Sequence, residues 1–141
     1  MAGTRQLAAI LISEIDGYSI LIQKDEDKAA KLKKRHRQFL RQLTPGFDWK
    51  ILQNIGPESL SIFPSAVEAV RCAIGLQNAF QEGIHVPVKI GIHLGDIILT
   101  DEEAIGDSLE VARKIANQSE KGGILVSNKI YEEIKNQEGI E

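Results

Sequence analysis

The sequence predicts an α+β fold in which helices pack on a mixed β-sheet, and three observations lead to this prediction. Apolar runs of strand length alternate along the chain with segments of helical periodicity. Two pairs of strand signals follow one another closely, which is typical of hairpins. The connections between these segments are short, which indicates that the 141 residues form one compact domain.

The first half of the chain is expected to hold a strand, a helix and a hairpin. An apolar strand over residues 6–13 is followed by a polar turn at 14–19 and a helix with one apolar side at 25–43. A helix-breaking segment at 44–48 then leads to two short strands at 49–55 and 58–63. Ala29, Leu32, Phe39, Leu40 and Leu43 form the apolar side of this helix. Gly56 and Pro57 occupy the tip of the hairpin.

The second half begins with a helix over residues 65–80 that carries Val67, Val70, Ile74 and Phe80 along one face. Strict alternation then places Val88, Ile90, Ile92 and Leu94 on one face of a strand. A second hairpin strand at 96–100, a helix at 105–118 that starts near Asp107 or Ser108, a strand at 122–127 and a last helix capped by Asn128 complete the chain. This order is ferredoxin-like at its centre.

Composition excludes several function classes. Charged residues are abundant but nearly balanced at net −3, so no overall field recruits nucleic acid or a membrane. The N-terminus has no signal-peptide pattern, and the chain has no membrane-span pattern. Cys72 is the only cysteine, which excludes an internal disulfide and favours a cytoplasmic location.

Five segments resemble, in their order and spacing, the class III adenylate/guanylate cyclase catalytic domain: "LAAILISEIDGYS", "NIGPESLSIFPSAVEAVRCAIGLQ", "KIGIHLGDIIL", "IGDSLEVARKIA" and "GGILVS". The resemblance runs from about Arg5 to Tyr131 and implies an α/β sandwich of that type. Family domains continue with a further hairpin, so we expect residues 1–141 to be the N-terminal part of a longer protein. Family members are head-to-tail dimers that convert a nucleoside triphosphate to its 3′,5′-cyclic monophosphate at two interfacial sites.

The resemblance implies that the first of two metal-binding carboxylates is Glu14, where the family has aspartate. The second position falls on Pro57, which offers no side-chain oxygen. Because magnesium requires oxygen ligands in tight octahedral geometry, we expect this loss to be severe. Two neighbours are candidates for rescue. Glu58 is expected to point to the opposite face of its strand, and Asp16 to share the face of Glu14 only if the strand persists that far.

The substrate half of the family site is substituted as well. The resemblance places the base-contacting positions at Gln53 and Glu103, and the ribose-orienting and transition-state positions at Glu110 and Lys114. Glu110 would repel a triphosphate, and Lys114 lacks the planar fork of arginine. The two residues have the favourable i, i+4 order and are expected to neutralise each other, the alternative being an ordinary solvated pair.

Other residues have weaker claims. Gly17 lies in a turn at a helix start, where backbone amides could bind an anion weakly. His93 and Cys72 are expected to be structural, without metal-ligand partners. The segment "KLKKRHRQ" around His36 has a cationic face that could bind a partner or phosphate, although a solvated helix face is the simpler interpretation.

The sequence therefore predicts a cyclase homology domain that is a catalytically impaired pseudo-cyclase with a regulatory or dimerisation role in intracellular signalling. Two alternatives stay open: a divergent adenylate or guanylate cyclase that uses Glu14 and Asp16 with one metal ion, and a pure oligomerisation module. We expect a homodimer, weak nucleoside triphosphate binding and no cofactor, with Mg²⁺ or Mn²⁺ only if residual cyclase activity exists.

Overall fold

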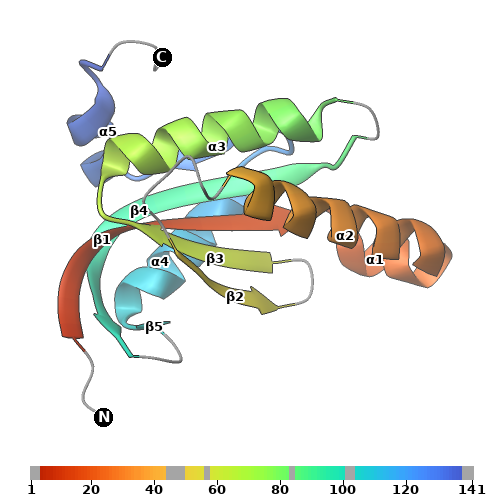
Figure 1. Cartoon of the computed structure of the whole chain (residues 1–141), viewed down its shortest axis with the longest axis horizontal. Coiled ribbons are helices and arrows are strands. Elements are labelled where there is room, and N and C mark those ends of the chain that lie inside the picture. The colour runs from red at the N-terminus through yellow and green to blue at the C-terminus, as the bar shows by residue number, and fades with distance from the viewer. Residues whose placement is uncertain (1–3, 44–49, 56–57, 83–84, 101–103, 138–141) are drawn as a thin grey trace.

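The computed structural model describes residues 4–43, 50–55, 58–82, 85–100 and 104–137, with the backbone alone for residues 43 and 50–55. The elements in chain order are β1 (Thr4–Ile15), α1 (Tyr18–Lys24), α2 (Glu26–Leu43), β2 (Lys50–Ile55), β3 (Glu58–Phe63), α3 (Ala66–Phe80), β4 (Val88–Leu99), β5 (Ala104–Ile105), α4 (Asp107–Gln118), β6 (Ile124–Val126) and α5 (Asn128–Ile134). Figure 1 shows their arrangement around one sheet.

The sheet has the order β2-β3-β1-β4-β5, with β6 pairing in parallel with the first part of β4. The other pairings are antiparallel, so the sheet is mixed, and the strands β2-β3-β1-β4 have ferredoxin-like order, as predicted. The two longest strands, β1 and β4, pair along their whole length. They form the centre of the sheet, and helices pack on both of its faces.

Two separate apolar cores cover the two faces of the sheet. On one face, α2, α3 and α5 pack over Leu11, Ile90 and Ile92, and the predicted alternation of β4 is confirmed because Val88 and Leu94 join the same cluster. On the other face, α4 packs over the remaining inward side chains: Ala8, Ile10, Ile12, Leu60, Ile62 and Ile97. Residues of β1 with even numbers therefore point to α4, and those with odd numbers point to α2 and α3.

Two local predictions were wrong, and one helix was not predicted. Residues 96–100 do not begin a new hairpin strand, because β4 continues through Gly95 and Asp96 while both residues keep their pairing with β1. The helix predicted over residues 25–43 is confirmed as α2, but α1, which precedes it, was not predicted. The last helix is capped by Ser127, whose hydroxyl accepts a hydrogen bond from the Ile130 amide, rather than by Asn128.

Two glycines of β4 allow α4 to approach the sheet closely. A Cβ atom at Gly91 would lie 2.3 Å from the backbone nitrogen of Ala116, and one at Gly95 would lie 2.2 Å from the Ser108 hydroxyl. Both glycines lie on the α4 face, in register with Ile12 and Ala8. The segment "GIHLGD" thus has a packing role: it holds α4 against the end of the sheet where the candidate site lies.

Candidate functional site

Two glutamates lie opposite each other where β1 and β3 meet, on the face of the sheet that α4 covers. Glu14 of β1 is the direct cross-strand partner of Glu58 of β3. Directly paired residues of neighbouring strands project to the same face. The expectation that Glu58 would point to the opposite face was wrong, because the strand register pairs it directly with Glu14.

Arg113 of α4 joins this pair to the helix above. Its Nε donates to the Glu58 carboxylate at 2.7 Å, and its Nη1 donates to the Glu110 carboxylate at 2.5 Å. The side chains of Glu58 and Arg113 are 20% and 29% exposed, whereas that of Glu110 is 66% exposed. The inner ion pair is therefore shielded from solvent and the outer one is largely hydrated.

The predicted pair between Glu110 and Lys114 was wrong, since Glu110 pairs with Arg113, three residues along α4. One guanidinium can serve two carboxylates at once because its donors form a fork. Lys114 is exposed and belongs to none of the ion pairs within the described part of the chain.

Further charges surround Glu14. Asp16 follows the end of β1 and pairs with Lys89 at 3.4 Å, while its backbone amide donates to the Pro87 carbonyl. Partial burial is the main reason that the pKa of Glu14 is raised, and repulsion from Glu58 and Asp16 adds to this, against the opposing effect of Lys89 and Arg113.

Several predicted site residues lie outside the described residues. Pro57 and Glu103 are among them, and for Gln53 only the backbone is described, in β2 opposite Leu60. Gly17 is described: it precedes α1 with a φ of 69°, and its carbonyl accepts from the Leu21 amide. Gly17 therefore supplies the turn that ends β1, which only glycine adopts without strain.

The remaining candidates are structural. Cys72 is buried, and burial raises its pKa to about 12, as expected for an unreactive thiol. His93 is half-buried on the α4 face, and desolvation, with Lys129 nearby, lowers its pKa. Across the ranges that the structure describes, no group of three or more His, Cys, Asp or Glu side chains is arranged to hold a metal ion.

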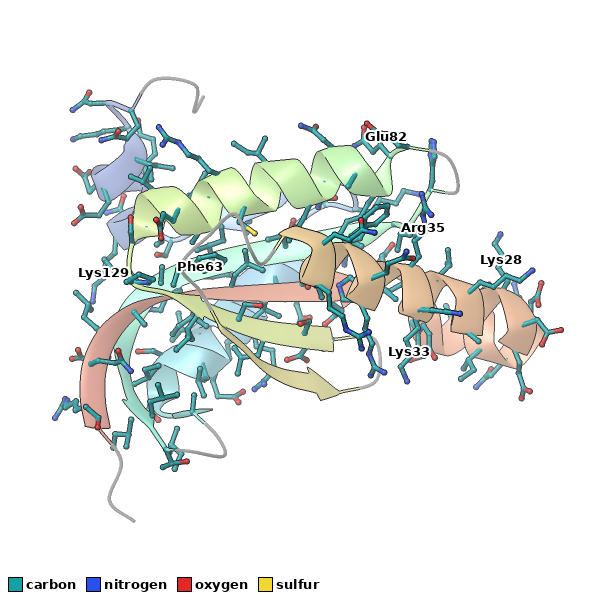
Figure 2. All side chains as sticks on the ribbon, viewed as in Figure 1. Lys28, Lys33, Arg35, Phe63, Glu82 and Lys129 are labelled. Carbon is teal, nitrogen blue, oxygen red and sulfur yellow. The ribbon has the colours of Figure 1, made fainter. Side chains whose placement is uncertain are left out.

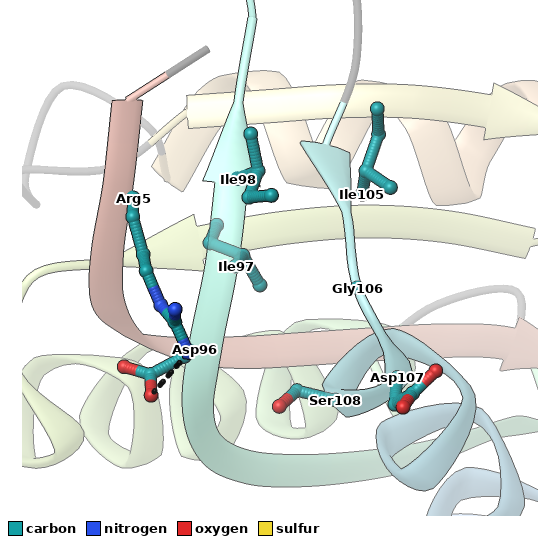
Figure 3. A pocket seen from close by; sticks show the side chains of 8 residues that line it. All are labelled: Arg5, Asp96, Ile97, Ile98, Ile105, Gly106, Asp107 and Ser108. Carbon is teal, nitrogen blue, oxygen red and sulfur yellow. Dashed lines mark ion pairs between the residues drawn. The ribbon is translucent and has the colours of Figure 1, made fainter.

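A small pocket of about 320 Å³ lies beside the start of α4, and Figure 3 shows the side chains that line it. Ile98 and Ile105 are direct partners across the β4–β5 pairing and are 42% and 46% exposed. Gly106, at φ 147°, turns the chain from β5 into α4. Arg5 and Asp96 form an exposed ion pair at the rim. The pocket is thus bordered by an apolar patch, which we call the β4–β5 patch (Ile98 and Ile105).

Proteins described as nucleotide cyclases are similar to this chain over nearly its whole length. "Putative adenylate cyclase 3" of Rhizobium meliloti (strain 1021) is 34% identical over 136 residues, which cover 91% of this chain and 23% of that protein. The crystal structure of an adenylate/guanylate cyclase/hydrolase from Silicibacter pomeroyi is 31% identical with a TM-score of 0.83, covering 92% of this chain and 80% of that one. No protein-family model matches the chain.

A more distant structure has the same fold. The adenylyl cyclase CyaB from P. aeruginosa superposes with a TM-score of 0.85 at 20% identity and covers 97% of this chain and 84% of its own. The identity and mutual coverage of the Silicibacter pomeroyi structure establish the relationship. The chain belongs to the class III adenylate/guanylate cyclase family and has the fold of its catalytic domain. It spans less than a quarter of the length of the Rhizobium meliloti relative.

The described carboxylates do not fit the two-metal arrangement of the family. Glu58 is bonded to Arg113, Asp16 is paired with Lys89, and the pKa of Glu14 is raised. Two of the three therefore already have a side-chain cation as a partner, Arg113 for Glu58 and Lys89 for Asp16. A pair of divalent ions needs several free oxygen ligands, so we derive no catalytic step through metal here.

Proposed function

We propose that this chain is a cyclase homology domain with impaired catalysis, which acts as a regulatory or dimerisation module in intracellular signalling. The observation that carries the proposal is the bond from Arg113 to Glu58, the carboxylate directly opposite Glu14. This bond places a side-chain cation next to the carboxylates that the family resemblance assigns to metal binding. The chain thus supplies, through Arg113, the positive charge that balances the Glu58 carboxylate.

The charges on α4 support the same proposal. Glu110 presents a largely exposed carboxylate at a position that the resemblance assigns to substrate binding. A triphosphate approaching this helix would meet that negative charge, with Lys114 as a point charge in place of a guanidinium fork. We expect nucleoside triphosphates to bind weakly and to turn over near the background rate.

A divergent, slow cyclase is the second candidate, and one observation favours it. Glu14 and Glu58 project to the same face, so the chain does bring two carboxylates together. The third candidate, a pure oligomerisation module, would dimerise without any nucleotide affinity. Cyclic product separates the second candidate from the others, and nucleotide affinity separates the first from the third.

The deciding experiment incubates the purified chain with ATP or GTP and Mn²⁺ and measures cyclic nucleotide. Loss of one well-placed electrostatic group alone lowers rates about 10²–10³-fold, so we expect product near background. A rate within roughly tenfold of an ordinary enzyme, about 10 s⁻¹, would overturn the proposal.

A second experiment tests the register on which the proposal rests. The double variant Glu14→Asp with Pro57→Asp restores the family's two carboxylates, and calorimetry should detect divalent-ion affinity that the parent chain lacks. Arg113→Gln in the same background removes the internal cation and should increase that affinity further. Identical titrations for parent and variants would mean that this end of the sheet is not the family's metal site.

No helix in the described residues is both long and apolar enough to cross a bilayer.

A further inference from the structure

The outer side of α2 carries a groove with four cationic side chains. The groove has a volume of about 710 Å³, and its main lining residues are Tyr18 of α1 with Lys33, Lys34, Arg37, Gln38 and Arg41 of α2. The α2 residues recur at helical spacing and so lie on one face. At 1.5 Å per residue, the cations extend along about 12 Å of the helix. We call this surface the α2 groove.

The cations of the α2 groove are not used inside the domain. Within the described residues, none of the four takes part in an ion pair. Arg35 is a useful contrast: its guanidinium donates to the Glu82 carbonyl and lies 4.6 Å from the centre of the Phe39 ring. Figure 2 shows Lys33 and Arg35 projecting to opposite sides of α2. One side of the helix is therefore engaged with the protein and the other is open.

The spacing of these cations destabilises α2 itself. Lys33 and Arg37, and Arg37 and Arg41, are like-charged neighbours at i, i+4, which destabilise an isolated helix. The two acidic residues of α2, Glu26 and Asp27, lie in its first turn, away from the groove. A face that served only for solvation would gain from mixed charges. The repulsion is relieved when an anion lies in the groove.

Charge is also segregated over the whole chain. Helix α2 contains seven Lys or Arg and two acidic residues, which is a net charge of +5. The complete chain has a net charge of −3, so all other residues together carry −8. A long polyanion or an anionic membrane would face this acidic remainder as well as the groove. A short acidic segment can contact the groove alone.

We propose that the α2 groove binds an acidic segment of a partner protein, most simply a helix with carboxylates at i, i+4 spacing. Arg37 and Arg41 can each grip a carboxylate with two donors, and Lys33 and Lys34 add point charges. Ile22 lies one turn beyond Tyr18 on α1 and is 40% exposed, which offers an apolar contact beside the charges. The inference does not depend on whether the domain is catalytic.

The test uses the intact chain and a labelled 15-residue helical peptide with glutamates at i, i+4, i+7 and i+11. The double variant Lys34→Glu with Arg37→Glu replaces two of the four positive charges of the groove with negative charges. Lys28→Glu with Lys31→Glu makes the same change of net charge at exposed positions of α2 outside the groove. At low salt we expect the groove variant to bind at least tenfold more weakly and the control to stay within twofold of the parent. Binding should also weaken as salt is added.

Shift mapping on the unaltered chain gives a readout that does not depend on how the variants fold. The peptide should perturb Tyr18, Gln38 and Arg41, and a glutamine-substituted peptide should not. Equal loss in both variants, or no perturbation of these residues, would overturn the proposal. Inorganic triphosphate that binds the groove more tightly than the peptide would assign it to a phosphate ligand instead. Loss of self-association in the groove variant would assign it to a second copy of this chain.

Discussion

His36 is a titratable side chain with no access to water. It is 1% exposed, its Nε2 lies 2.9 Å from the Ser13 hydroxyl, and its ring packs on Phe80. Burial, with a smaller effect of Arg37, lowers its pKa from 6.5 to about 4. The cationic sequence around His36 indicated a surface position, whereas the helix turns this residue toward β1 and α3 and leaves its cationic neighbours outside.

We predict an acid-sensitive stability that depends on His36. Its pKa is lower in the folded state, so its contribution is fully present above pH 6.5 and is lost as the pH falls toward 4. The whole change is at most about 3 kcal/mol. Urea unfolding at pH 7.5, 6.0 and 5.0 measures it, and His36→Gln should flatten the slope in this range. An equally steep slope in His36→Gln would assign the acid sensitivity to other groups.

Arg113 is predicted to stabilise the fold by neutralising Glu58 and Glu110. Arg113→Gln should lower the free energy of unfolding at pH 7 by about 1–2 kcal/mol, because Glu58 is shielded and loses a charged partner. Lys114→Gln is the matched control and should change stability by less than about 0.5 kcal/mol. Equal effects of the two variants would show that the ion pair contributes nothing.

Among the elements, the contact between β4 and α4 depends most on residue size. At Gly91 an added methyl group would meet the backbone of Ala116, while at Gly95 it would meet mainly the Ser108 side chain. Only the second obstacle can be removed by a substitution. The two glycines of one motif therefore have different tolerances, although they share a face.

We predict that Gly91→Ala and Gly95→Ala each destabilise the domain by about 1–3 kcal/mol, as overpacking does. Ser108→Gly should recover most of the loss in Gly95→Ala and none of the loss in Gly91→Ala. Thermal or urea unfolding of the single and double variants forms a cycle that measures this coupling. Recovery of both glycine variants, or of neither, would contradict the packing geometry.

For the whole molecule, the proposed dimer is the main open property. The β4–β5 patch presents two paired isoleucines beside α4, and Val111 on α4 is also 40% exposed. Neighbouring exposed apolar side chains of this size are typical of interaction surfaces. A two-fold dimer that covers them would use the end of the β1–β4 pair opposite to Glu14, since Ile98 pairs with Arg5 whereas Glu14 pairs with Lys89.

We expect sedimentation at tens of micromolar to show a concentration-dependent dimer. Ile98→Glu with Ile105→Glu should make it monomeric, because burying an unpaired charge in an interface is strongly unfavourable. Ile20→Glu, at another exposed apolar position, is the control and should leave the dimer intact. A chain that is monomeric throughout, or a dimer insensitive to the patch variant, would refute this arrangement.

Local periodicity and family resemblance were sufficient to predict most elements and the fold. The alternation in β4 and the apolar spacing in α3 each repeat over a few residues, and burial of one face imposes that repeat. Such patterns do not report which side chains meet across the sheet. They also wrongly predicted that the strand ends at Gly95, whereas the pairing of β4 with β1 continues through this residue.

The sequence by itself determined the family and the ferredoxin-like order, and it predicts that Glu14, Pro57, Glu110 and Lys114 are substituted site positions. Only the tertiary structure decided that Glu58 faces Glu14. It also decided that Arg113, 55 positions further along the chain than Glu58, neutralises Glu58, and that Glu110 pairs with Arg113 and not with Lys114. The physical reason is the distance along the chain over which each interaction acts. Helix and strand signals arise from neighbours a few residues apart, whereas the charges of the site are paired by strand register and by the close approach of α4 over Gly91 and Gly95.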